Sequence, residues 1–163
     1  FVLEKRGEKL WTPKEPGLVL KMFDDSSAPP TSKPGRLIKM RQLADQFTGE
    51  MTDWSGSSYQ LRLMPKPLFR YESTDPQVLD GALFSLTYTT DPEVVVVVEA
   101  RKSDDGYRWM YGFGRMNVGD LKVFHRDKEI WNAERLKSPF YYKDGIYTLF
   151  NDLPIPKPAS AEQ

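Results

Sequence analysis

A run of five valines at residues 94–98 constrains the fold more than any other feature of the sequence. β-branched side chains favour extended backbone, and an apolar run without polar alternation suits a strand that is covered on both faces. We therefore predict that residues 93–101 form the central strand of a sheet, with a neighbour on each side. Charged residues such as Glu93 and Arg101 border the run, which is typical of strands that would aggregate if exposed.

Turn sequences on both sides of this strand predict antiparallel pairing. Residues 90–92 (Thr-Asp-Pro) separate the valine strand from a β-rich run before it, and residues 104–106 (Asp-Asp-Gly) separate it from the run that follows. Residues 126–128 (Arg-Asp-Lys) lie between two further short runs in the same way. Because strands that are neighbours in sequence usually pair, we expect a meander of about six antiparallel strands.

One amphipathic helix is predicted over residues 36–48. Apolar side chains recur there at spacings of three and four, which places them on one helical face; they are Leu37, Met40, Leu43, Ala44 and Phe47. Pro34 before the stripe and Gly49 after it are typical helix boundaries. The fold class is therefore mainly β of the α+β type, a meander packed against one helix.

The chain divides into four predicted parts. Residues 1–23 contain an N-terminal hairpin, with two short β-rich runs around Arg6-Gly7, and residues 24–35 form a linker rich in proline and serine. Residues 36–150 hold the helix and the sheet, and residues 151–163 form an extended tail. With 163 residues and 39% apolar content, the chain can bury one substantial core.

Charge and composition exclude several classes of partner. The sequence has 23 basic and 23 acidic residues, so it offers no overall positive field for nucleic acid. It contains no cysteine, which rules out disulfides and thiolate chemistry, and no apolar stretch approaches the length of a membrane span.

His125 is the only histidine, so every triad or zinc site based on histidine would have to include it. We interpret it as a partly exposed residue at the end of a strand, and we expect it to be dispensable. No nucleophile elbow, phosphate-binding glycine loop or zinc-protease motif is present. We therefore predict no catalytic residue, no metal site and no cofactor.

An aromatic row is the most suggestive candidate for binding. Trp109, Tyr111 and Phe113 share one face of a predicted strand, and Tyr107 lies beside them. Exposed, such a row could stack on sugar rings or anchor a protein partner. Buried, it would be the sheet face that the helix covers, and this interpretation is favoured because the helix needs an apolar face to pack on.

Glu99 is the only carboxylate for which we consider catalysis. Glu99 and one of Asp75, Asp80 or Glu93 could form the pair of carboxylates that a weak glycoside hydrolase needs. Its simpler role is an ion pair with an arginine, and the candidates are Arg101, Arg108 and Arg115.

Several segments together resemble a family of bacterial proteins of unknown function that is best known from planctomycetes. The similar segments are LRLMPKPLFRYES (61–73), DGALFSLTYTTDPEVVVVVEAR (80–101), YGFGRMN (111–117) and KEIW (128–131), within a likeness that spans about residues 10–150. The resemblance implies an exported protein, periplasmic or extracellular, that continues upstream of Phe1, and it leaves a cytoplasmic location open. It supplies no activity and no site residue.

These observations favour a non-enzymatic binding or structural module that acts through protein contacts. The alternative is a carbohydrate-directed protein that uses Trp109, Tyr111, Tyr107 and Glu99. Because an isolated hairpin is marginal in water, residues 1–11 need a surface to pack on. We expect apolar surface around Leu3, Leu10 and Trp11 to be covered by another subunit or by an N-terminal part that the sequence lacks.

Overall fold

The computed structural model describes residues 3–5, 7–24, 27–137 and 145–147. It contains two compact units: Phe1–Pro16 with Lys137–Gln163 form one, and Gly17–Leu136 forms the other. The predicted tail, residues 151–163, lies outside the described residues.

The first unit contains an antiparallel hairpin of β1 (Leu3–Lys5) and β2 (Glu8–Trp11). Gly7 has a φ of +80° in the turn, a conformation that glycine adopts without strain. The hairpin predicted around this glycine is therefore present. β1 and β2 make a separate two-stranded sheet, so the main sheet contains neither of them.

The second unit contains one helix and a nine-stranded antiparallel sheet. Its elements are β3 (Lys21–Met22), α1 (Lys33–Ala44), β4 (Phe47–Thr52), β5 (Ser58–Leu63), β6 (Phe69–Tyr71), β7 (Val78–Tyr88), β8 (Asp91–Ser103), β9 (Gly106–Arg115), β10 (Asp120–His125) and β11 (Lys128–Ala133). The strand order is β11-β10-β4-β5-β7-β8-β9-β3, and β6 pairs with β7. The fold class is confirmed as mainly β, but the sheet has more strands than the six predicted.

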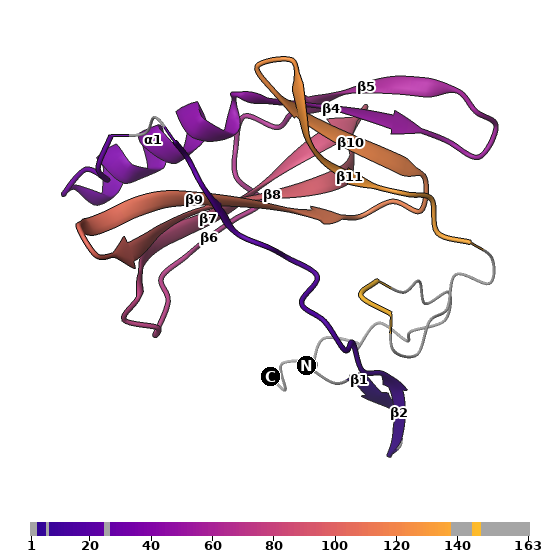
Figure 1. The fold of residues 1–163 in the computed structure, drawn as a ribbon, viewed down its shortest axis with the longest axis horizontal. Helices are drawn as coiled ribbons and strands as arrows, with labels where there is room; N and C mark the ends of the chain where they lie inside the picture. The colour runs from indigo at the N-terminus through magenta and orange to yellow at the C-terminus, as the bar shows by residue number, and fades with distance from the viewer. Residues whose placement is uncertain (1–2, 6, 25–26, 138–144, 148–163) are drawn as a thin grey trace, which may run out of the picture. The chain divides into compact units, whose positions relative to one another are not determined.

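The sheet curls strongly into a half-barrel (Figure 1). The two edge strands of the sheet, β3 and β11, approach each other across the open side of the half-barrel. There the Nζ of Lys21 in β3 donates to the carbonyl of Ile130 in β11 at 3.2 Å. The rings of Phe113 in β9 and Trp131 in β11 also lie 5.8 Å apart. We call this region, where β3 and β9 approach β10 and β11, the seam.

The valine strand is central, as predicted. β8 pairs with β7 on one side and with β9 on the other, and two-residue turns join it to both. Val94, Val96 and Val98 are fully buried on the face that belongs to the core. On the opposite face Val97 is buried and Val95 is half-buried.

Helix α1 packs against β7 and β8, and its buried residues Met40, Leu43 and Ala44 join the core (Figure 1). It begins three residues earlier than predicted because Ser32 caps it: the Ser32 hydroxyl accepts from the Gly35 N–H at 3.2 Å.

The helix also ends earlier than the predicted boundary at residue 48, so that boundary is wrong. Phe47 is buried in β4 rather than on the helix, because the chain turns at Asp45 and enters the sheet. A buried aromatic residue satisfies the spacing of a helical stripe and a strand equally well, which explains the misplaced end.

The pairing of the strands departs from a simple meander. β4 lies between β5 and β10, and β3 pairs with β9, so strands far apart in sequence are neighbours. A pairing between distant strands closes a long loop at a cost in chain entropy, and no local sequence pattern marks it. The hairpins β7-β8, β8-β9 and β10-β11, by contrast, arise from local turns.

Candidate functional site

A cavity of about 300 Å³ opens at the seam. Three parts of the second unit line it: the strand pair β3 and β9, helix α1 with the turn after it, and the β10–β11 turn. Its lining residues are Met22, Phe23, Asp24, Lys39, Leu43, Gln46, Tyr111, His125, Arg126 and Lys128. We call it the seam cavity.

The inner wall of the seam cavity is apolar and aromatic. Phe23 and Leu43 are buried, and the ring of Phe23 lies 4.7 Å from that of Tyr111. The backbone N–H of Phe23 donates to the Trp109 carbonyl at 3.0 Å, which extends the β3–β9 pairing and holds the ring in place. The wall is therefore preformed by the core.

The outer part of the cavity carries an excess of positive charge. Lys39 comes from α1, Arg126 from the β10–β11 turn and Lys128 from the first position of β11. Among the described residues of the lining, Asp24 is the only carboxylate. Burial raises the pKa of Tyr111, and the nearby charge of Asp24 raises it further, so the phenol stays neutral at physiological pH.

His125 lies at the end of β10 and is half-buried, as the sequence predicted. Its Nε2 is 2.9 Å from the Oε1 of Gln46, and its ring lies 5.5 Å from that of Phe47. These contacts fix the imidazole at the edge of the cavity. The expected dispensability of His125 stays a prediction, since the ring also lines a possible ligand site.

The turn that carries Arg126 has a strained backbone. Arg126 has a φ of +50° and Asp127 a φ of +64°, as a two-residue hairpin of type I′ requires. Asparagine and glycine are the usual residues there, and an arginine in the left-handed region is uncommon. This conformation costs roughly 1 kcal/mol, which the pairing of β10 with β11 around the turn must offset.

The aromatic row is split between the core and the cavity. Trp109 is fully buried and Phe113 nearly so, so neither ring presents a face to a ligand. Tyr111 is half-buried and lines the seam cavity, whereas Tyr107 is half-buried outside it. Only Tyr111 among the predicted binding residues therefore reaches the candidate site.

Glu99 lies on the other face of the sheet and is buried in an ion-pair network. It accepts from Arg101 Nη1 at 2.7 Å and from the Tyr71 hydroxyl at 2.5 Å. Burial and the bond to Glu99 raise the pKa of Tyr71 well above its usual range. The structure thus shows the ion pair with Arg101 that was the simpler expectation, away from the cavity.

The proposed interface residues belong to the first unit. Leu10 and Trp11 are half-buried, and the indole Nε1 of Trp11 donates to the carbonyl of Gly145 at 2.6 Å. The side chain of Leu3 is outside the described set. Whether another chain covers these residues stays a prediction.

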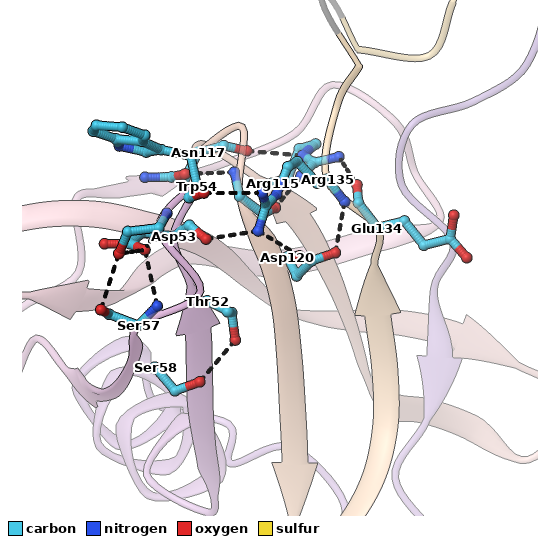
Figure 2. Close-up of polar contacts among 12 residues, drawn as sticks. Thr52, Asp53, Trp54, Ser57, Ser58, Arg115, Asn117, Asp120, Glu134 and Arg135 are labelled. Atoms are coloured by element: carbon cyan, nitrogen blue, oxygen red, sulfur yellow. Dashed lines mark hydrogen bonds and ion pairs between the residues drawn. The ribbon is translucent and has the colours of Figure 1, made fainter.

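A second polar cluster fixes one end of the half-barrel (Figure 2). Arg135 follows β11; its Nη2 donates to the Asp53 carbonyl at 2.6 Å, and its backbone N–H donates to Asp120 Oδ1 at 2.9 Å. Arg115 donates to three backbone carbonyls, those of Asn117, Gly119 and Glu134. Both arginines thus tie loops together, which explains the cluster structurally.

The turn between β4 and β5 is held by the same cluster. The Asp53 carboxylate accepts from the N–H groups of Ser55 and Ser57, from the Ser55 hydroxyl and from the Tyr59 hydroxyl. These hydrogen bonds, the one from the Ser55 hydroxyl foremost, outweigh partial burial and lower the pKa of Asp53. Trp54 on this turn is 85% exposed.

Sequence reasoning missed most of the cavity. Lys39 lies off the apolar stripe of the predicted helix, and Arg126 and Lys128 belong to a predicted turn. The available signal was the concentration of His125, Arg126 and Lys128 within four positions of an otherwise balanced chain. Placing that group opposite α1 requires the β4–β10 pairing, which no local pattern indicates.

Among the described residues, no group of three or more histidine, cysteine or acidic side chains is placed to hold a metal ion. No helix of this part of the chain is long and apolar enough to cross a bilayer. Comparison of the chain with protein-family models, curated proteins and solved structures finds no match.

Proposed function

We propose that this chain is a binding module and that the seam cavity is its ligand site. The observation that carries the proposal is the convergence of three cations on a preformed cavity whose wall is aromatic. Binding sites for small molecules typically combine an apolar wall with a few polar groups that orient the ligand. The volume of about 300 Å³ lies at the lower end of the range for such sites.

A binding module is also the class of protein that the sequence favours, and the ligand site that we propose for it is the seam cavity. Trp109 is buried in the core and Glu99 is paired with Arg101, so Tyr111 is the one residue of the carbohydrate alternative that lines the cavity. Protein contacts through Leu10 and Trp11 are a separate proposal, which concerns the first unit.

The test is a titration of the full chain with three naphthalene probes whose polar substituents are anionic, neutral and cationic. The probes are 2-naphthoate, 2-naphthalenemethanol and 2-naphthylmethylammonium, and binding is followed by amide chemical shifts. We expect at least one probe to bind with a Kd of about 1 mM or tighter, the affinity typical of ligands with about a dozen non-hydrogen atoms. Shift changes should concentrate at residues that line the cavity.

A cavity-filling variant provides the control. Met22 lines the cavity and is 51% exposed, so Met22→Trp should fill the space without disturbing the core. Val19 is 65% exposed on the same segment and outside the lining, which makes Val19→Trp the matched control. Binding should be lost in the first variant and kept in the second. Equal binding by both variants, or no binding by the unmodified chain, would contradict the proposal.

A further inference from the structure

The charge of the seam cavity contrasts with that of the whole chain. Basic and acidic residues are equal in number overall, yet the described residues of the lining include Lys39, Arg126 and Lys128 against one carboxylate, Asp24. The ion pairs of the described residues include neither Lys39 nor Lys128. The described lining therefore carries more positive than negative charge, although the whole chain is balanced.

These cations come from two elements that are far apart in sequence. Lys39 is on α1, and the other two are at the tip of the β10–β11 hairpin, so an anion in the cavity would be approached by both elements. A guanidinium offers a planar pair of donors to an oxyanion, and an ammonium adds a compact charge.

The apolar part of the lining indicates which chemical group of the ligand is attached to the anionic group. Phe23, Tyr111 and Leu43 give the cavity an apolar wall with two aromatic rings. Inorganic phosphate alone would leave that wall without contacts. In a ligand that joins a flat apolar group to an oxyanion, the apolar group would cover the wall and the oxyanion would neutralise the positive charge.

We infer that the seam cavity binds an organic oxyanion, a carboxylate or a phosphate monoester attached to an aromatic or similarly flat apolar group. Arg126 and Lys128, with Lys39, hold the oxyanion, and the body lies on Phe23 and Tyr111. This inference rests on the proposed function and adds the class of ligand to it.

The strained position of Arg126 allows its charge to be removed while the turn keeps its conformation. Glycine adopts a φ near +50° freely, so Arg126→Gly should keep the turn and the fold. Asp24 carries the opposing charge, so Asp24→Asn should favour an anionic ligand. The two variants therefore predict opposite changes in affinity at a single site.

The experiment compares Kd values for the full chain at low salt, with 2-naphthoate, 2-naphthyl phosphate, 2-naphthalenemethanol and inorganic phosphate as probes. We expect at least one of the two aromatic anions to bind about tenfold more tightly than the alcohol, as one charge-assisted contact allows. Which anion binds better distinguishes a carboxylate site from a phosphate site. Inorganic phosphate should bind more weakly than either.

The variants complete the test. Arg126→Gly should weaken binding of the aromatic anion about tenfold and leave the alcohol unchanged, while Asp24→Asn should strengthen the anion. If the alcohol binds as tightly as the anions, or if Arg126→Gly leaves anion binding unchanged, the inference is wrong and the proposed function stands. If no aromatic probe binds, both fail.

Discussion

At the scale of single residues, Asp80 shows how a buried charge can hold several elements together. Its carboxylate in β7 is 1% exposed; Arg36 Nε in α1 and Arg70 Nη2 in β6 each donate to its Oδ2 at 2.6 Å. Burial alone would raise the pKa of Asp80, but the hydrogen bonds and charges of Arg70 and Arg36 outweigh burial and lower it. The ionised form is therefore favoured by folding.

We predict that Asp80→Asn destabilises the protein by about 3 kcal/mol at pH 7, because two partly buried arginines lose their counter-charge. A lowered pKa in the folded state means that the stabilisation is complete above the unfolded value of about 3.9. It is lost as the pH falls through the lower folded value. The difference in urea unfolding free energy between the two proteins should therefore shrink with acid.

A matched control is Asp105→Asn. Asp105 is 81% exposed at its side chain and pairs with Arg108 at 3.5 Å, so its removal should change stability little at any pH. A loss of stability for Asp80→Asn that stays constant from pH 7 to pH 2 would contradict the ionic explanation.

At the scale of elements, β8 gives the sharpest test of the core. Val96 pairs with Phe84 on one side and Phe113 on the other and is fully buried. Val96→Asp would bury a charge with no partner, at a cost of several kcal/mol against a total stability of about 5–15 kcal/mol. We expect the variant to be unfolded or insoluble by circular dichroism.

Val95 is the comparison within the same strand. It faces the opposite side of the sheet and is half-buried, so Val95→Asp can keep its carboxylate close to water. This variant should remain folded with a lower melting temperature. Similar melting temperatures for the two variants would show that the faces of β8 are assigned incorrectly.

The elements also show which parts of the fold a sequence can predict. The valine strand and the hairpin at Arg126 are local: composition and turn residues are sufficient for them. The early end of α1 and the β4–β10 pairing depend on contacts with distant residues. Phe47, for example, fits the helical stripe and is moved into β4 only by the packing of the half-barrel.

The same reasoning explains why the candidate site was not predicted. The aromatic row was identified correctly as one face of a strand, but whether a face is open depends on what covers it. Phe23 was placed at the end of the N-terminal part, residues 1–23, next to the predicted linker, yet it packs on Tyr111 and forms the cavity wall. Cavities arise from the meeting of distant elements, which local patterns do not specify.

At the scale of the whole molecule, the two units differ in what they contribute. Among the described residues, the core cluster runs from Phe23 to Ala133 and so lies within Gly17–Leu136. The lining of the seam cavity belongs to the same unit. The second unit therefore holds both the apolar interior and the candidate site.

We predict that a fragment of residues 17–136 folds cooperatively on its own. It should unfold in one urea transition, with a midpoint close to that of the full chain, because it keeps every residue of the core cluster. If another subunit covers Leu10 and Trp11, the full chain should self-associate in sedimentation equilibrium while the fragment stays monomeric. A fragment that lacks a cooperative transition would show that the core depends on the first unit. A fragment that associates as strongly as the full chain would place the contact on the second unit and remove the role assigned to Leu10 and Trp11.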